Sequence, residues 1–142
     1  MRPFLLPLLL LAAPALAWEE PARGTATRTN IMDAIRPHIE WALGAPVEFV
    51  VWDLRRDGDV AFASLMAQRP GGGVIDVYAT PAPRRGEIDP EVGDGATVQA
   101  LLQKSGDTWV ATHHAIGATD MWWAWEEFCP IWHTVIPEVC GG

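Results

Sequence analysis

Only one stretch of this chain has clear helical periodicity, and it precedes every stretch that has the composition of a β-strand. Four apolar residues recur at every fourth position, as on one face of an α-helix: Ile31, Ile35, Ile39 and Leu43. Asn30 is a favourable N-cap and Gly44 a natural C-terminal stop, so the sequence predicts a helix over 30–43. Pro37 lies inside this segment and is expected to kink the helix or to divide it into two short ones.

The segments after residue 46 are rich in β-branched and aromatic residues and are separated by glycine and proline turns. This composition is typical of β-strands, and it predicts strands at 47–54, 60–67, 74–79, 97–103 and 109–116. The pair Asp57-Gly58 lies between the first two and predicts a type I′ hairpin turn, in which both central residues need positive φ. The stretch 80–95 is predicted to be irregular.

This order of elements predicts an α+β fold, with one N-terminal helix packed on a curved antiparallel sheet of about four or five strands. A short Trp-rich helical segment over 121–128 is expected to follow the sheet. Residues 18–29 are predicted to be a flexible N-terminal arm, and 30–142 a single α+β domain. Cystatin-like and NTF2-like domains share this layout, an analogy of fold that carries no function by itself.

Residues 1–17 have the organisation of a secretory signal peptide. Arg2 supplies the positive end, the apolar run 4–11 is too short to span a bilayer, and 15–17 is a small-x-small cleavage site. The sequence therefore predicts a periplasmic or secreted protein with no membrane anchor after cleavage of the signal.

The charge and the cysteines agree with this location. With 18 Asp and Glu against 10 Lys and Arg, the formal net charge is −8, which disfavours nucleic acid as a partner. Cys129 and Cys140 are the two cysteines, and in an oxidising compartment they are expected to form a disulfide. A zinc site is the alternative, because Cys129 and His133 are four residues apart and Cys140 could complete a set. Pro130 disturbs the helix that this spacing needs, so no metal is predicted.

Four of the eight tryptophans are concentrated near the C-terminus: Trp122, Trp123, Trp125 and Trp132. Tryptophan anchors interfaces and stacks on sugar rings, so this cluster predicts a binding surface for a glycan or an envelope protein. The alternative is that these side chains cover the open face of the sheet. On a helix, Trp122 and Trp125 would share one face, with Trp123 about 100° away and exposed to solvent.

An enzyme is the alternative to a binding domain. His114 with Asp53 or Asp120 could form an acid–base pair in a pocket between helix and sheet, as NTF2-like enzymes do. His113 and His114 are adjacent on a predicted strand and should point to opposite faces. No spacing specifies a catalytic residue or a cofactor, so a binding function without catalysis is predicted, through the Trp-rich segment or the 80–95 loop.

Three stretches together resemble a group of small uncharacterised secreted proteins from proteobacteria. They are IMDAIRP at 31–37 with GAPVEFVV at 44–51, AF at 61–62 with QRPGG at 68–72, and GDTWV at 106–110 with IGATD at 116–120. The resemblance covers roughly residues 29–125 and implies the secreted location and the fold, with no established activity. The Trp-dense segment and the cysteine-bearing C-terminus depart from the pattern of the group.

Overall fold

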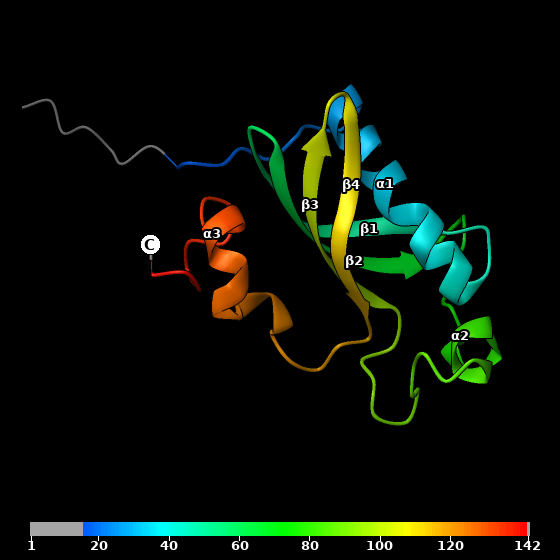
Figure 1. Ribbon diagram of the computed structural model, residues 1–142. Helices are drawn as coiled ribbons and strands as arrows, with labels where there is room; N and C mark the ends of the chain where they lie inside the picture. The colour runs from blue at the N-terminus through cyan, green and yellow to red at the C-terminus, as the bar shows by residue number, and fades with distance from the viewer. Residues whose placement is uncertain (1–15, 142) are drawn as a thin grey trace, which may run out of the picture.

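The computed structural model describes residues 16–141, which form an N-terminal helix, a four-stranded antiparallel sheet and a short Trp-bearing helical segment, in that order (Figure 1). The fold is therefore α+β, as predicted. The main elements are α1 (Ala26–Leu43), β1 (Glu48–Asp57), β2 (Val60–Gln68), β3 (Thr97–Ser105) and β4 (Thr108–Ile116). Residues 1–15 of the predicted signal peptide lie outside the described part of the chain.

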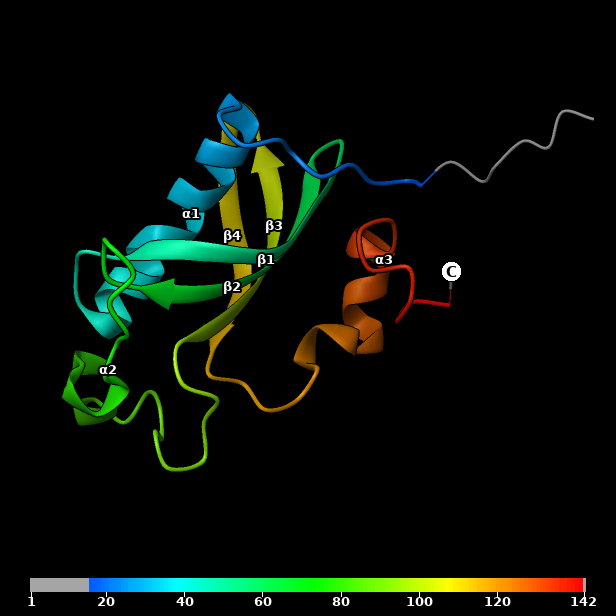
Figure 2. The same ribbon diagram turned by 180° about the vertical axis from the view of Figure 1, so that it is seen from behind.

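The sheet is an open meander in the order β1-β2-β3-β4, so β1 and β4 are its edges. It is strongly twisted, because β1 and β2 run nearly across the direction of β3 and β4 (Figures 1 and 2). The strand predicted at 74–79 is wrong: Val74 is 93% exposed, and Val77–Ala79 is a 3₁₀ helix, η1. The Asp76 carboxylate accepts from the Tyr78 N–H and caps this turn, and the four-residue helix α2 (Pro81–Arg84) follows it.

Helix α1 starts four residues before the predicted position. Thr25 is the N-cap, and its hydroxyl accepts from the Arg28 N–H at 3.4 Å. The prediction of Asn30 as N-cap is wrong because the first turn is polar and carries no apolar period. The helix continues through Pro37 and is not divided into two.

One face of the sheet packs on α1. The four residues of the predicted helical stripe are all buried, at 0–1% exposure: Ile31, Ile35, Ile39 and Leu43. They meet the inward-facing side chains of the strands, among them Leu65, Val98 and Leu102. The periodicity of the sequence therefore located this core correctly.

The first hairpin turns one residue later than predicted. Asp57 pairs with Val60, so the central residues are Gly58 and Asp59. Gly58 has φ +55°, whereas no residue other than glycine has positive φ in the described chain, so the predicted type I′ turn is wrong. A glycine with positive φ at the first central position is the requirement of a type II′ turn, which also matches the twist of the strands.

The other face of the sheet is covered by the C-terminal segment (Figure 2). This segment is not the single helix predicted over 121–128 but three short ones: η2 (Trp122–Ala124), η3 (Glu126–Phe128) and α3 (Cys129–Trp132). Trp125 has an extended backbone, with φ −66° and ψ 137°, and interrupts the helical path between η2 and η3. Pro130 sits in the first turn of α3, where its missing N–H costs nothing.

Arg55 fastens the C-terminal segment to β1. Its guanidinium donates to the Asp53 carboxylate at 2.7 Å, on the same strand. It also donates to the Val135 carbonyl at 3.1 Å and to the Glu138 carboxylate at 2.6 Å. The Trp18 ring lies 4.8 Å from this guanidinium, so one cation joins both ends of the described chain to the sheet.

The N-terminal arm is also attached. Glu19 and Arg56 exchange two backbone hydrogen bonds of 2.9 Å, and Pro21 is buried. Residues 26–29 of the predicted arm belong to α1, and the preceding residues contact the sheet through this pair.

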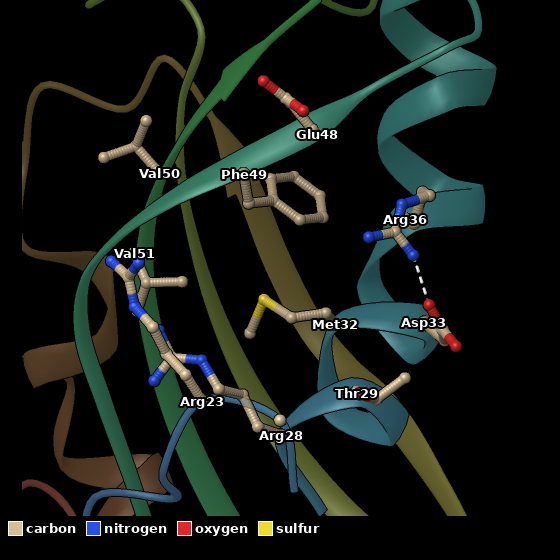
Figure 3. Close-up of a pocket in the computed structure, with 11 residues that line it drawn as sticks. Arg23, Arg28, Thr29, Met32, Asp33, Arg36, Glu48, Phe49, Val50 and Val51 are labelled. Atoms are coloured by element: carbon tan, nitrogen blue, oxygen red, sulfur yellow. Dashed lines mark hydrogen bonds and ion pairs between the residues drawn. The ribbon is translucent and has the colours of Figure 1, made fainter. Parts of the chain in front are cut away.

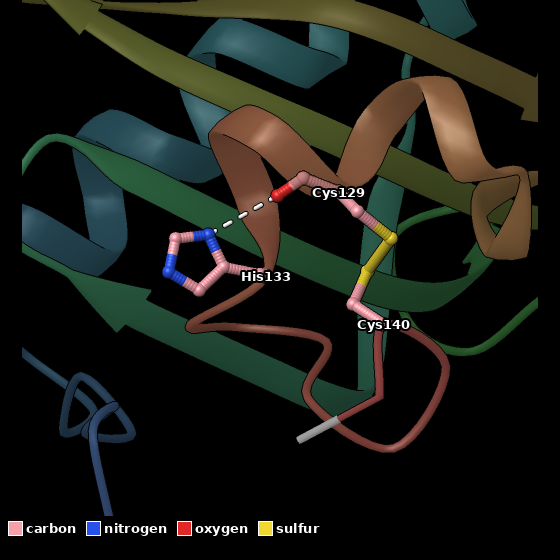
Figure 4. Close-up of a disulfide and its surroundings, with 3 residues drawn as sticks. All are labelled: Cys129, His133 and Cys140. Atoms are coloured by element: carbon pink, nitrogen blue, oxygen red, sulfur yellow. Dashed lines mark hydrogen bonds between the residues drawn. A yellow bond between two sulfur atoms is a disulfide. The ribbon is translucent and has the colours of Figure 1, made fainter.

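Cys129 and Cys140 form the predicted disulfide (Figure 4). Both sulfurs are used in this bond, so the alternative zinc set with His133 is wrong. The Nδ1 atom of His133 lies instead 3.1 Å from the Cys129 carbonyl oxygen. The bond closes the chain around α3 and holds the end of the C-terminal segment in place.

Candidate functional site

A pocket of about 400 Å³ opens where the Trp-rich segment meets the start of β3. We call it the Gln99 pocket. It is lined by the loop before β3, by β3 itself and by the segment after β4: Gly93, Asp94, Gln99, Ala118, Thr119, Asp120, Met121 and Trp123.

The β3–β4 pairing brings these segments together. Val98 lies opposite Ile116, so the residues before β3 and after β4 are neighbours. The Asp94 N–H donates to the Gly117 carbonyl, and the Gly117 N–H donates to the Thr97 carbonyl, both at 2.8 Å. Gly117 has φ +67°, and a Cβ there would lie 2.9 Å from the Gly95 carbonyl oxygen, so only glycine allows this close approach.

The pocket lies beside an unusual concentration of buried polar side chains. The buried polar residues of the described chain are Thr80, Thr97 and Gln99, and two of these three are at the start of β3. The Thr80 hydroxyl donates to the Val77 carbonyl at 2.6 Å and is satisfied.

Three buried side-chain atoms lack a hydrogen-bond partner within the described chain: Thr97 Oγ1, Gln99 Oε1 and Trp122 Nε1. Of these residues, Gln99 lines the pocket, and Trp122 lies between the lining residues Met121 and Trp123 in the sequence. Thr97 and Gln99 are two apart on β3 and face the side that Trp122 covers. A buried polar atom left unpaired costs about 1–3 kcal/mol, and such atoms are rare in native proteins. The unpaired amide of Gln99 in the pocket lining is therefore a candidate contact for a polar ligand.

The structure separates the four candidate tryptophans. Trp122 and Trp132 are buried in the core under the C-terminal segment. Trp123 is half-buried, with its ring centroid 5.7 Å from that of Phe62, and it lines the Gln99 pocket. Trp125 is 55% exposed. The prediction that Trp123 is the exposed ring, and that Trp122 and Trp125 share a face, is wrong because the segment is not one regular helix.

The groups around the pocket are chemically complementary to a sugar. The indole of Trp123 offers an apolar surface for the C–H face of a pyranose ring. The carboxylates of Asp94 and Asp120 can accept hydrogen bonds from ring hydroxyls. The Gln99 side chain lies in the same lining, with its amide oxygen buried and unpaired.

The three residues proposed for an acid–base pair are not brought together. His114 lies on the α1 side of the sheet, with its ring centroid 4.8 Å from that of His38. The Asp53 carboxylate is engaged by Arg55, and Asp120 lines the Gln99 pocket. The geometry therefore lends no support to the NTF2-like enzyme.

The adjacent histidines do point to opposite faces, as predicted. The His113 ring centroid lies 4.9 Å from that of Phe128, on the side of the C-terminal segment. His114 instead lines a cavity of about 660 Å³ between α1 and β4, together with His38, Trp41 and Glu87.

The pKa of His114 tests how this residue is packed in the cavity between α1 and β4. Desolvation against the neighbouring elements lowers the pKa of His114, and the charge of His38 lowers it further, although the residue is exposed to solvent, which limits the size of the shift. We expect an NMR titration to give a pKa below the ordinary value of about 6.5. His38→Gln should raise it. Because the folded-state pKa lies below the unfolded value, the stabilising contribution is complete above about pH 6.5 and is lost as the pH falls toward the folded-state pKa. A His114 pKa at or above 6.5 would contradict this packing.

The sequence did not identify Gln99, Asp94 or Thr97 as site residues. The available signal was a single glutamine between Val98 and Ala100, in a strand whose other central residues are apolar. A glutamine in such a strand is buried together with its apolar neighbours, so its side-chain amide needs a hydrogen-bond partner.

Comparison with known protein families, with curated proteins and with solved structures found no match. None of the helices within residues 16–141 is long and apolar enough to cross a membrane. In the same residues, no group of three or more His, Cys, Asp or Glu side chains is placed to hold a metal ion.

Proposed function

We propose that this protein is an exported binding domain that takes a neutral sugar unit of an envelope glycan in the Gln99 pocket, without catalysis. The observation that carries the proposal is a pocket whose lining combines the unpartnered buried amide of Gln99 with the indole ring of Trp123. The export rests on the predicted signal peptide, supported by the disulfide and by the resemblance to small secreted proteobacterial proteins.

A neutral polyhydroxylated ligand fits the pocket better than an apolar or an anionic one. An apolar ligand would leave the Gln99 amide oxygen unpaired. An anionic ligand would meet Asp94 and Asp120 in the lining and the net charge of −8. Sugar hydroxyls donate hydrogen bonds and carry no charge, so they suit both the amide and the carboxylates.

Isothermal titration calorimetry with two neutral oligosaccharides, an N-acetylglucosamine tetramer and maltotetraose, tests the proposal. Because one hydrogen bond contributes about 1 kcal/mol, we expect Gln99→Leu to weaken binding by roughly fivefold. The same change removes an unpaired buried polar group, so it should leave the melting temperature unchanged or raise it. Trp123→Ala should abolish binding, because the stacking surface is lost.

Trp125→Ala is the matched control, since Trp125 is exposed and does not line the pocket. It should bind both sugars as the wild type does. Failure of the wild-type protein to bind either oligosaccharide would overturn the proposed ligand. Release of reducing ends from a bound oligosaccharide, lost in Asp94→Asn or Asp120→Asn, would overturn the absence of catalysis.

A further inference from the structure

A separate groove lies between α1 and the outer edge of β1 (Figure 3). We call it the α1–β1 groove. It has a volume of about 440 Å³ and is lined chiefly by Arg23, Arg28, Met32, Arg36, Phe49 and Val51. The Gln99 pocket is formed by β3 and the segments around it, so the two sites share no lining residue.

The β1 side of the groove is an unpaired strand edge. β1 is the edge strand of the sheet, and the described arm pairs with it at Arg56, through Glu19. Hydrogen-bonding direction alternates along an antiparallel strand. Ala67 lies opposite Phe49 on β2, and its backbone N–H donates to the Ala96 carbonyl. The backbone polar groups of Ala67 therefore point away from β1, and this pair is not hydrogen-bonded. Phe49 and Val51 therefore direct their backbone N–H and C=O groups outward, into the groove.

The N-terminal arm already forms one strand-like pair with the edge of β1. Glu19 and Arg56 exchange both backbone hydrogen bonds, as two antiparallel strand residues do. Beyond this pair, the edge from Glu48 to Val51 is free for roughly four further residues of an extended chain, at about 3.3 Å per residue. Unprotected edges of this kind accept added strands.

The groove contains three of the ten cationic side chains of an acidic protein. The Arg36 Nε donates to the Val47 carbonyl at 3.1 Å, and Arg36 also pairs with Asp33. Arg28 donates to the Pro21 carbonyl at 3.0 Å. These backbone bonds hold two guanidinium groups in position. Within residues 16–141, Arg23 forms no ion pair or side-chain hydrogen bond.

The floor of the groove is apolar. Met32 is buried, and Phe49 and Val51 are half-buried, so the groove has an apolar base below a cationic rim. Figure 3 shows the Met32 and Phe49 side chains directed toward each other across it, with the Arg36 guanidinium near Phe49. That guanidinium lies 5.6 Å from the Phe49 ring centroid. An added strand would place alternate side chains on this floor and toward the arginines.

We propose that the α1–β1 groove binds an extended acidic segment of a partner protein, which adds a strand to β1. The segment pairs with the backbone of Phe49 and Val51. Its carboxylates meet the guanidinium groups of Arg23, Arg28 and Arg36. Arg28 pairs with Glu20 at 3.7 Å and Arg36 with Asp33, so Arg23 provides the charge that has no ion-pair partner within residues 16–141. The attraction is local, because the chain as a whole is negative and would repel such a segment elsewhere.

Fluorescence polarisation with a labelled peptide of alternating Glu and Val residues tests this proposal. The full-length mature protein should bind the peptide, and binding should weaken at high salt. The same peptide with N-methyl groups on alternate backbone nitrogens cannot complete the ladder and should lose binding. A peptide with Lys in place of Glu should also fail to bind.

Arg23→Glu reverses the charge of the arginine that has no ion-pair partner within residues 16–141, and it should weaken binding of the acidic peptide at least tenfold. Because Arg23 is exposed, the variant should fold normally. Arg84→Glu is the matched control, since Arg84 is exposed and outside the groove, and it should bind as the wild type does. Three results would overturn the proposal: no binding of the acidic peptide, equal binding of the Lys peptide, or sedimentation showing a wild-type dimer that Arg23→Glu dissociates. The last result would assign the edge to a second copy of the chain.

Discussion

Replacing Trp132 with alanine is expected to lower the free energy of unfolding by about 3–5 kcal/mol. Trp132 is 1% exposed, and its ring packs at 6.0 Å from that of Phe128 and at 5.6 Å from that of His113. Its Nε1 also donates to the Leu102 carbonyl at 2.9 Å, so Trp132→Ala leaves a cavity and removes this buried hydrogen bond. Urea denaturation of the oxidised protein measures this loss.

Trp125→Ala is the control for this experiment, because Trp125 belongs to the same segment but is 55% exposed. We expect a loss of at most about 0.5 kcal/mol there, as at most surface positions. Equal losses in the two variants would show that the C-terminal segment does not form a core with the sheet.

Ile35→Ala is expected to lower the free energy of unfolding by about 2–5 kcal/mol. Ile35 is fully buried between α1 and the sheet, at 0% exposure, so the removed methyl groups leave a cavity that the close packing cannot fill. Asn30→Ala, at an exposed position of the same helix, should change the stability by no more than about 0.5 kcal/mol. A loss below about 1 kcal/mol for Ile35→Ala would show that this face of α1 is not packed in the core.

The sequence predicted the elements whose burial follows a simple period. The apolar stripe from Ile31 to Leu43 repeats every four residues and specified both the helix and its buried face. The start of α1 at Ala26 was missed because a polar first turn has no such period. The stretch 74–79 has strand composition, but no neighbouring strand pairs with it, and pairing is a tertiary property.

The candidate site was predictable only in part. Asp120 and Trp123 were identified by residue type, and both line the Gln99 pocket. Gln99 and Asp94 could not be grouped with them, because their proximity depends on the register of β3 against β4 and on the close approach at Gly117. The roles of the tryptophans were also wrong in detail, since the extended backbone at Trp125 sets which rings are buried.

Two-dimensional NMR of the mature protein, titrated with the N-acetylglucosamine tetramer and with maltotetraose, tests the proposed sugar site most directly. The Gln99 side-chain amide and the Trp123 indole N–H give separate signals, and both residues line the pocket. We expect both to shift together and to saturate with at least one sugar, while the Trp125 indole signal stays in place. Unchanged Gln99 and Trp123 signals with both sugars, or shifts confined to Trp125, would contradict a sugar site in the Gln99 pocket.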